Sequence, residues 1–259
     1  MAKGGAVDIE ITSTTNNLVK ETTKLAQKKY RNESKLFLLE GQKAVEEAFA
    51  LNINFENVFI LKEKAEKYSQ FPKKILTNEA VLKKISTTQT PPEIIATAKQ
   101  IEFSKKDISS KNKIILLENI KDSGNLGTIF RTATALGVEA IILSGETADI
   151  YNPKTIRSAV GNIFKIPFIT IKDINEAKKL LPNHKFYATV VPQKNTTNIT
   201  QLSLPSKAVI MFGSEASGLS NNAITISDKK ITIPISKNVE SLNLSTAVTI
   251  CIWELFKNA

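Results

Sequence analysis

The second half of the chain alternates short apolar segments with helical patterns, and this alternation restricts the possible folds more than any other feature. Six segments read as strands: KIILLENI, VEAIILS, KIPFITI, KFYATVV, KAVIMFG and KITIPI. Helical patterns lie between several of them, near 124–136, 153–159 and 174–181. Strands that are apolar on both faces and separated by helices are typical of a parallel sheet covered on both sides. We therefore predict an α/β fold with a parallel sheet in this half.

The first half shows a similar alternation on a smaller scale. A helix is expected near 15–30, and strands and helices follow in the segments KLFLLEG, QKAVEEAFALN, NVFILK, NEAVLKKIS and EIIATAK. The stretch from Gln100 to Lys113 is polar and rich in serine and lysine, as domain linkers are. We predict a smaller N-terminal α/β domain at 1–105, a linker at 106–112 and the parallel-sheet domain at 113–259.

The chain carries a formal net charge of +10, which favours an anionic partner because a basic surface attracts phosphate backbones. A solubility surface of purely compositional origin would give the same charge. Basic residues nevertheless gather in the expected first helix, where we predict that Lys24, Lys28, Lys29 and Arg31 bind nucleic acid. Tyr30 lies among them and either stacks on a base or packs at the end of the helix.

Composition and termini argue against several functional classes. No apolar stretch approaches the roughly 18 residues that a membrane span needs. The start, MAKGGAVDIE, lacks the apolar core of a secretory signal, and we expect it to be in part a leader with no role in the fold. We expect a soluble, cytoplasmic protein.

The single cysteine, Cys251, and the single histidine, His184, leave neither an internal disulfide nor a zinc cluster, so no metal is expected. Cys251 reads as a packing residue and His184 as a surface residue.

One glycine loop is unusual. The segment GSEASGLS, from Gly213 to Ser220, follows an apolar strand and resembles the phosphate-binding loop G-x-x-x-x-G-K-[ST]. Leu219 stands where that motif needs lysine, and Glu215 adds a negative charge. A loop of this kind disfavours phosphate and indicates a neutral or cationic ligand. A tight strand-to-helix turn without a ligand is the alternative.

Three segments that follow strands together resemble one protein family. NLGTIFRTA, from Asn125 to Ala133, matches N-x-G-x-[IL]-x-R-[ST]-A. IMFGSEASGL matches an apolar strand followed by G-x-E-x-x-G-[LI], and IPISKNVESLNLS matches I-P-M-x-G-x-x-x-S-L-N-[VL]-[SA]. Ile235 and Lys237 depart from the third pattern. In content and order these motifs resemble the SpoU, or TrmH-like, RNA 2′-O-ribose methyltransferases of the SPOUT superfamily.

The resemblance implies a fold, a cofactor and a dimer. The expected fold is an α/β knot, in which the C-terminal segment threads a loop to form a deep trefoil knot. The expected cofactor is S-adenosylmethionine, whose sulfonium is cationic and which carries no phosphate. Family members are homodimers that pack through the C-terminal region, so Ile250, Trp253 and Phe256 are candidate interface or core residues.

The resemblance also assigns site residues. Expected to bind the cofactor are Val190, Gly213, Ile233 and Leu242. Expected to act in catalysis are Asn125, Arg131, Glu215, Ser241 and Asn243. Because a guanidinium is effectively always protonated, we expect Arg131 to clamp a phosphate and stabilise developing negative charge rather than to act as a base. Glu215 is expected to bond loop amides or favour the cationic cofactor, and Ser241 and Asn243 to order the third loop.

The N-terminal half resembles the family's substrate-binding domain, an α/β module related to ribosomal RNA-binding proteins. The segment KKYRNESKLFLLEGQKAVEEA carries this likeness, and Glu40 and Gly41 within it are expected to shape a turn. The predicted function is transfer of a methyl group to a ribose 2′-hydroxyl of structured RNA, with ribosomal RNA as the expected substrate. A tRNA 2′-O-methyltransferase, a catalytically inactive RNA-binding module of the same fold, and a methyltransferase with another substrate are the alternatives.

Overall fold

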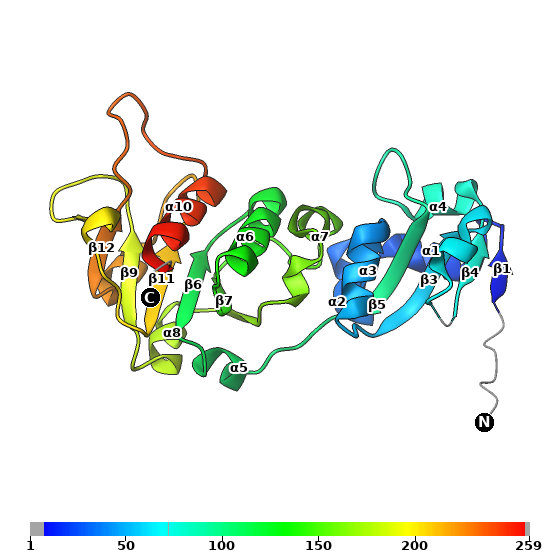
Figure 1. Cartoon of the computed structure of the whole chain (residues 1–259), viewed down its shortest axis with the longest axis horizontal. Helices are drawn as coiled ribbons and strands as arrows, with labels where there is room; N and C mark the ends of the chain where they lie inside the picture. The colour runs from blue at the N-terminus through cyan, green and yellow to red at the C-terminus, as the bar shows by residue number, and fades with distance from the viewer. Residues whose placement is uncertain (1–7, 72, 257–259) are drawn as a thin grey trace. The chain divides into compact units, whose positions relative to one another are not determined.

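The chain forms two compact units, seen here in a computed structural model that describes residues 8–71 and 73–256 (Figure 1). Unit 1 contains the described residues up to Ile101 together with Asp149–Gly161. Unit 2 contains Glu102–Ala148 and the described residues from Asn162 onward. The chain therefore passes from one unit to the other three times. The part of the expected leader at 1–7 lies outside the described residues.

Unit 1 is built on a five-stranded mixed sheet. Its elements are β1 (Ile9–Ile11), α1 (Asn17–Lys24), α2 (Lys28–Ser34), β2 (Leu36–Glu40), α3 (Gln42–Ala50), β3 (Phe55–Leu61), the 3-10 turns η1 (Lys62–Lys64) and η2 (Glu66–Tyr68), β4 (Ile75–Thr77), α4 (Glu79–Ile85), β5 (Ile94–Lys99) and α7 (Pro153–Ala159). The strand order is β1-β4-β3-β5-β2. Strand β4 pairs parallel with β1 and β3, whereas β5 pairs antiparallel with β3 and β2.

The helix predicted near 15–30 is interrupted. Helix α1 ends at Lys24 and α2 begins at Lys28. In an unbroken helix the carbonyls of Leu25 and Ala26 would accept hydrogen bonds from amides four residues later. Here they accept instead from Nη1 of Arg31, at 2.7 and 2.8 Å. The expectation that the first ten residues have no role in the fold is also wrong, because Ile9 in β1 pairs with Ile75 in β4.

Arg31 is a structural residue of unit 1. It is only 1% exposed. Its Nε and Nη2 donate to Oδ2 of Asp149 at 2.9 and 2.6 Å, in addition to the two carbonyl bonds. A guanidinium has five N–H donors in a fixed planar arrangement. Here all three of its nitrogens donate, two to a carboxylate and one to the two carbonyls. Arg31 was predicted to bind RNA. Its guanidinium is instead buried and paired with Asp149, so it is not accessible to RNA.

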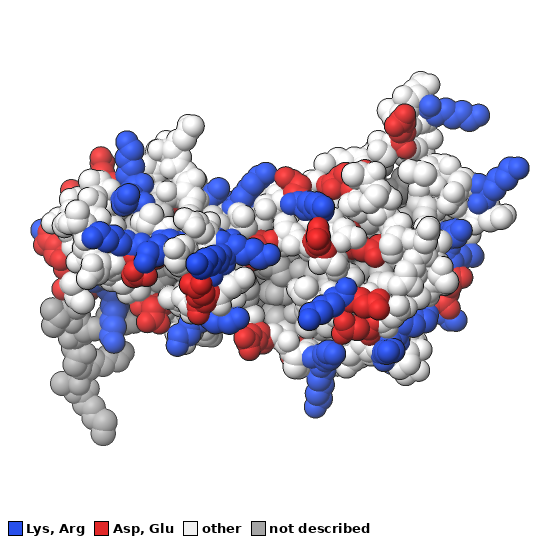
Figure 2. Space-filling view, turned by 180° about the vertical axis from the view of Figure 1, so that it is seen from behind, with Lys and Arg blue, Asp and Glu red and all other residues white. Residues whose placement is uncertain are grey.

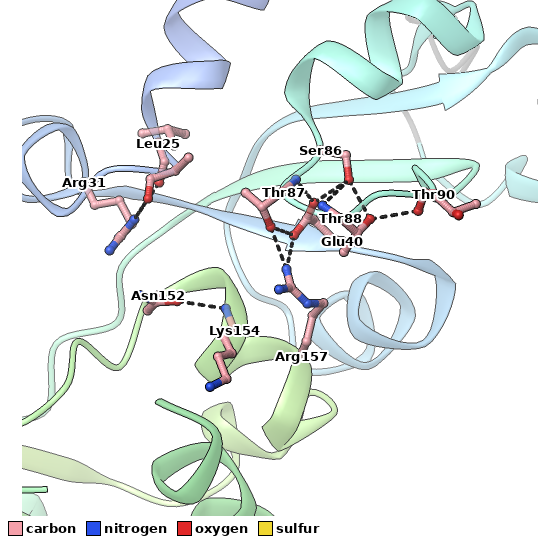
Figure 3. A network of polar contacts seen from close by, with 11 residues as sticks. Leu25, Arg31, Glu40, Ser86, Thr87, Thr88, Thr90, Asn152, Lys154 and Arg157 are labelled. Atoms are coloured by element: carbon pink, nitrogen blue, oxygen red, sulfur yellow. Dashed lines mark hydrogen bonds and ion pairs between the residues drawn. The ribbon is translucent and has the colours of Figure 1, made fainter. Parts of the chain in front are cut away.

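A second polar cluster in unit 1 surrounds Glu40, at the end of β2 (Figure 3). Its carboxylate accepts from the Ser86 hydroxyl at 2.9 Å, from the Thr87 amide at 2.7 Å and from Nη1 of Arg157 at 2.5 Å. Arg157 lies on α7. Glu40 therefore holds together β2, the segment after α4 and α7, which agrees with the expectation of a structural residue at a strand-to-helix turn.

Unit 2 contains a seven-stranded sheet in which each pair of neighbouring described strands is parallel, as predicted. Its elements are α5 (Lys105–Ser109), β6 (Lys113–Glu118), α6 (Ser123–Ala135), β7 (Ala140–Ser144), η3 (Asn162–Phe164), β8 (Phe168–Ile171), α8 (Asn175–Leu180), β9 (Lys185–Thr189), β10 (Thr197–Asn198), η4 (Ile199–Gln201), β11 (Ala208–Phe212), α9 (Asn221–Ile226), β12 (Lys229–Thr232) and α10 (Leu244–Phe256). The strand order is β10-β12-β9-β11-β6-β7-β8.

All six predicted strands of this half are present, as β6, β7, β8, β9, β11 and β12, and β10 is an additional strand of two residues. Strands β6, β7 and β11 are almost wholly buried along their length. Helix α6 packs against α10, and α8 against α9. Helix α5 lies where the linker was expected and begins with a capping box formed by Ser104 and Asp107. Threading of the C-terminal segment through a loop stays a prediction.

The order of the strands brings the motif loops together. Strands β6, β11, β9 and β12 are consecutive neighbours in the sheet and run in the same direction. The loops that follow them begin at Asn119, Gly213, Val190 and Ile233. In open parallel sheets ligands bind beyond the carboxyl ends of the strands. The loops that carry the second and third motifs, and the loop that leads into α6 with the first motif, therefore share one edge of the sheet.

Candidate active site

The glycine loop after β11 folds back on itself. The amide of Gly218 donates to the carbonyl of Ser214 at 2.9 Å. The hydroxyls of Ser214 and Ser217 lie 2.8 Å apart. A Cβ placed on Gly213 would lie 2.0 Å from the carbonyl carbon of Gly218, closer than atoms pack. Gly213 is one of the residues expected to bind the cofactor, but the direct requirement for glycine here is the close approach of the loop's own backbone.

Residues from the three motifs join in one hydrogen-bonded chain. The side-chain amide of Asn125 donates to Oε1 of Glu215, and the amide of Asn243 donates to Oδ1 of Asn125 at 3.2 Å. The first residue lies in α6, the second in the glycine loop and the third just before α10. Three of the five predicted catalytic residues are thus brought together, although 118 positions separate Asn125 from Asn243.

Helix caps orient Asn125 and Asn243, the two asparagines of this hydrogen-bonded series. Asp122 is the N-cap of α6, and its Oδ1 accepts from the backbone N–H of Asn125 at 2.7 Å. Asn243 accepts on its Oδ1 from the N–H and hydroxyl of Ser245, at 2.9 and 2.7 Å, at the beginning of α10. Each asparagine is therefore held by the first turn of a helix. The expectation that Asn243 orders the third loop agrees with these contacts.

A cavity of about 590 Å³ lies beside this network, within unit 2. All four predicted cofactor residues, Val190, Gly213, Ile233 and Leu242, line it. Glu215 and Ser241 line it as well. The remaining lining residues come mainly from the ends of β9, β11 and β12, from the loops after them and from α10: Thr189, Val191, Pro192, Gln193, Phe212, Ser214, Ala216, Ser217, Gly218, Leu219, Ile224, Thr232, Ile235, Glu240, Leu244, Ala247 and Cys251.

The cavity wall has a distinctive charge. Among the described residues that line it there is neither lysine nor arginine, whereas two are glutamates, Glu215 and Glu240. A site for phosphate groups would need cationic side chains or amides without neighbouring carboxylates. Most of the other lining residues are apolar or contribute backbone groups, as in pockets for small organic ligands. The cavity therefore suits a neutral or cationic ligand with apolar parts.

Two predicted catalytic residues lie outside the hydrogen-bonded chain. Arg131 is exposed on α6, and its side chain makes neither a hydrogen bond nor an ion pair with any described residue. Ser241 is exposed at the cavity and likewise has no hydrogen-bond partner in the described part of the chain. Glu215 bonds Asn125 and not the loop amides that we expected. Arg131 and Ser241 are thus available to a ligand.

Sequence reasoning missed one residue at the site, Glu118. This buried glutamate ends β6 and accepts from the amide and the hydroxyl of Ser220, both at 2.8 Å. Ser220 is the N-cap of α9 and closes the glycine loop. A carboxylate at the end of an otherwise apolar strand was the available signal, because burying a charge requires hydrogen-bond partners.

Cys251 was predicted to be a packing residue and His184 a surface residue, and only the first prediction agrees with the structure. Cys251 is buried in α10 at the cavity wall, where burial raises the pKa of its thiol to about 12, as expected of a packing residue. His184 is 5% exposed, not a surface residue as predicted. Its Nε2 bonds the carbonyl of Lys111 at 2.8 Å, and burial lowers its pKa.

The basic residues of unit 1 fall into two groups. Lys28 and Lys29 are exposed, and Lys24 is half-exposed in an ion pair with Glu21 at 2.7 Å. Arg31 is buried, as described above. On the face drawn in Figure 2, acidic side chains lie among the basic ones. The net charge of the chain therefore does not by itself define a binding surface.

Helix α10 separates the three residues proposed as core or interface. Phe256 is buried, whereas Ile250 and Trp253 are exposed, Trp253 by 58%.

Among the described residues, no group of three or more His, Cys, Asp and Glu side chains is placed to hold a metal. None of the helices in the described part of the chain has the length and apolar character to cross a membrane.

Comparison with known proteins assigns both units. Residues 112–253 match the SpoU rRNA Methylase family, and residues 16–96 match the MRM3-like substrate binding domain. An uncharacterized tRNA/rRNA methyltransferase of Synechocystis is 30% identical, over 94% of this chain and 92% of its own length. The 23S rRNA (guanosine(2553)-2′-O)-methyltransferase RlmP of Bacillus subtilis is 29% identical, over 95% of this chain and 98% of its own.

Among solved structures, an AdoMet-bound rRNA methyltransferase from Sinorhizobium meliloti superposes with a TM-score of 0.86. It is 28% identical and covers 95% of this chain and 97% of its own. The likeness thus extends over both units, and the three motifs lie within the matched family segment. On these matches, and with its motif residues gathered at one edge of a parallel sheet, the chain belongs to the SpoU rRNA methylase family.

Proposed function

We propose that this protein transfers the methyl group of S-adenosylmethionine to a ribose 2′-hydroxyl of ribosomal RNA. The observation that carries the proposal is the cavity of unit 2, which gathers all four predicted cofactor residues and has two carboxylates but no cationic side chain among its described lining residues. Such a cavity matches a ligand that has an apolar ring system, a positive charge and no phosphate.

The residues present fit this cofactor. Val190, Ile233 and Leu242 supply apolar surface for the adenine ring, and the backbone beside them supplies donors and acceptors for its edge. Glu215 and Glu240 place negative charge where a sulfonium is attracted. When bound there, S-adenosylmethionine supplies a methyl group activated for attack by an oxygen nucleophile.

The remaining chemistry belongs to residues of this chain. Alkylation of a 2′-hydroxyl requires the oxygen to be aligned with the methyl group and its proton to pass to solvent or to an RNA phosphate, so positioning is the main task. Arg131 is proposed to clamp an RNA phosphate and to stabilise negative charge that develops on the oxygen. The chain Asn243–Asn125–Glu215 is proposed to fix the loops on either side of the reacting groups. Ser241 is proposed to bond the substrate or cofactor directly.

Ribosomal RNA is the proposed substrate, and unit 1 its binding domain. This assignment is supported by the match of residues 16–96 to a substrate-binding domain and by relatives named as rRNA methyltransferases. In this proposal the N-terminal substrate domain predicted at 1–105 also includes Asp149–Gly161, and Lys24, Lys28 and Lys29 contact RNA. Catalysis belongs to the rest of the chain, and the protein acts in the cytoplasm.

A homodimer is part of the proposal. Trp253 and Ile250 expose apolar surface on α10, and a large apolar side chain left in water favours association. Sedimentation equilibrium of the wild type and of Trp253→Glu tests this. We expect a dimer that the substitution shifts toward monomer, whereas a monomeric wild type at micromolar concentration would contradict it.

Two measurements test the function. Calorimetry with S-adenosylmethionine alone should show binding that requires no added metal. Ribose-methylation mapping of RNA from cells with and without the gene should then reveal one or more rRNA sites that depend on it. Loss of a tRNA methylation instead would identify a tRNA enzyme. Cofactor binding with no gene-dependent methylation of any RNA would indicate an inactive module.

A further inference from the structure

Unit 1 contains a second cavity, which shares no lining residue with the cofactor cavity. It has a volume of about 320 Å³, at the lower end of the roughly 300–1,000 Å³ typical of ligand pockets. Its walls come from α1, α2, β2, β3 and β5, all within one unit. No activity described above uses it. Its size suits one nucleoside and excludes a helix of RNA.

Tyr30 forms one wall of this cavity and is flanked by two ammonium groups. Nζ of Lys24 lies 5.5 Å from the centroid of its ring, and Nζ of Lys29 lies 5.8 Å from it. The ring is only partly buried, and its hydroxyl has no hydrogen-bond partner in the described part of the chain. Lys29 makes no ion pair with a described residue. A partly exposed aromatic ring therefore contacts a lysine ammonium that has no carboxylate partner among the described residues.

Polar groups face the same cavity from the sheet and from α2. The side-chain amide of Asn57 donates to the hydroxyl of Thr97 at 3.3 Å, and Thr97 is almost fully buried. The amide oxygen and second N–H of Asn57 are left for another partner. Glu33 lines the cavity and its carboxylate has no partner among the described residues. Leu18, Leu25 and Leu36 supply apolar surface.

This combination corresponds to what an unstacked base requires. Sequence-specific RNA recognition stacks bases on aromatic side chains and hydrogen-bonds their edges, while nearby cations hold the backbone. We propose that this cavity binds a single unstacked nucleotide of the RNA substrate, with its base stacked on Tyr30, its edge bonded by Asn57 and its phosphate held by Lys29. The proposal rests on the RNA substrate proposed above and adds the place where one nucleotide is recognised.

The first test measures binding of short RNA to the full chain. The probes are four fluorescein-labelled hexaribonucleotides, oligo-A, oligo-C, oligo-U and alternating GU, followed by anisotropy at one fixed salt concentration. We expect at least one to bind the wild type and Tyr30→Ala to weaken it about tenfold or more, which is about 1.4 kcal/mol. Tyr30→Phe, which keeps the stacking face, should stay within about twofold. Equal binding by wild type and Tyr30→Ala, or no binding of any probe to the wild type, would overturn the proposal.

Charge variants and melting curves separate recognition from folding. Lys29→Ala should weaken binding and make the dependence on salt shallower, because one phosphate contact is lost. Lys64→Ala removes the same charge from η1, outside the cavity wall, and should change neither quantity. If Tyr30→Phe loses as much binding as Tyr30→Ala while both melt like the wild type, stacking is not the role of Tyr30 and the proposal fails.

Base stacking also has its own spectroscopic signal. An oligo-A probe with 2-aminopurine at one position should lose fluorescence on binding to the wild type and to Tyr30→Phe, but not to Tyr30→Ala. Cofactor calorimetry on the same variants should be unchanged. Base binding through Tyr30 without methyl transfer would refute the proposed function and leave the cavity proposal standing. Methyl transfer and RNA affinity that are both unaffected in Tyr30→Ala would do the reverse.

Discussion

Glu118 and Ser220 are joined by two hydrogen bonds although 102 positions separate them in the chain. The first ends the strand that leads to α6, and the second closes the glycine loop at the start of α9. The carboxylate uses one oxygen for the amide of Ser220 and the other for its hydroxyl. This buried contact therefore ties the loop of the first motif to the loop of the second.

Replacing Glu118 by glutamine should loosen that tie. One of the two Ser220 donors would then face an amide N–H in place of an oxygen, and a buried unsatisfied group costs roughly 1–3 kcal/mol. We expect the free energy of unfolding, measured by denaturant titration, to fall by this amount and cofactor affinity to fall with it. Glu139→Gln is the control, since Glu139 accepts one backbone N–H at the surface. Equal losses in the two variants would refute a special role for Glu118.

Gly213→Ala should damage the cofactor cavity. The added methyl would lie 2.0 Å from the backbone of Gly218, and backbone atoms cannot yield as a flexible side chain can. We expect calorimetry to detect at least tenfold weaker binding of S-adenosylmethionine. Gly137→Ala adds a methyl in open space at a positive φ, so it brings backbone strain but no collision. Unchanged cofactor affinity in Gly213→Ala would show that the loop is not packed in solution as it is here.

Arg31→Met should destabilise unit 1 strongly. It removes the partner of Asp149 and leaves a carboxylate that is 14% exposed without its cation. Breaking a buried ion pair costs roughly 3–5 kcal/mol. The double variant Arg31→Met with Asp149→Leu should recover part of this loss, as a double-mutant cycle would report. Lys24→Ala, which breaks a surface pair, should cost less than about 1 kcal/mol.

The pairs Glu118–Ser220 and Arg31–Asp149 show which contacts could not be predicted from the sequence. The strands of unit 2 were predictable because burial on both faces leaves uninterrupted apolar runs, as in β6 and β11. The residues predicted to bind the cofactor could be named because their motifs are local in sequence, and all four line one cavity. The partner of Arg31 is 118 positions away, and no local pattern encodes such a pairing. A basic residue in a basic segment consequently read as an RNA ligand.

Other differences have local causes that only the fold displays. At the break after Lys24, the carbonyls of Leu25 and Ala26 accept from the side chain of Arg31. His184 has the polar neighbours of a surface loop in sequence, yet the carbonyl of Lys111 holds its ring inside. The two-residue strand β10 is too short to produce a periodic signal.

Arg131→Lys should slow methyl transfer without affecting stability. The substitution keeps the charge but loses the planar fork that holds a phosphate through two bonds. Because Arg131 is exposed and has no described partner, the melting temperature should stay nearly constant. We expect single-turnover transfer at saturating RNA to fall at least about tenfold, or about 1.4 kcal/mol. Transfer at the wild-type rate would exclude the clamp, and a collapsed melting temperature would indicate a structural role.

Acid should weaken unit 2 through Asp228. Burial alone would raise the pKa of this carboxyl, but hydrogen bonds from the amide of Phe186 and from Lys185 and Lys178 outweigh it and lower the pKa from 3.8 to about 2. A depressed carboxyl pKa contributes stability that is present above the unfolded value and lost as pH falls toward the folded one. Denaturant titrations between pH 5 and pH 2 should therefore show declining stability, with a smaller decline in Asp228→Asn. Parallel curves would contradict the assignment.

The inclusion of Asp149–Gly161 in unit 1 has a consequence for synthesis on the ribosome. Unit 1 cannot be completed when Ile101 emerges, because Asp149 and Arg157 are still to be made. The ribosome must add the residues from 102 to 161 before unit 1 is complete, and at roughly 5–20 residues per second that wait lasts roughly 3–12 s. During this interval Arg31 and Glu40 lack their later ionic partners, while β6, α6 and β7 are being translated. The nascent N-terminal region thus passes through an incomplete state, in which chaperone binding or misfolding competes with the arrival of thirteen further residues.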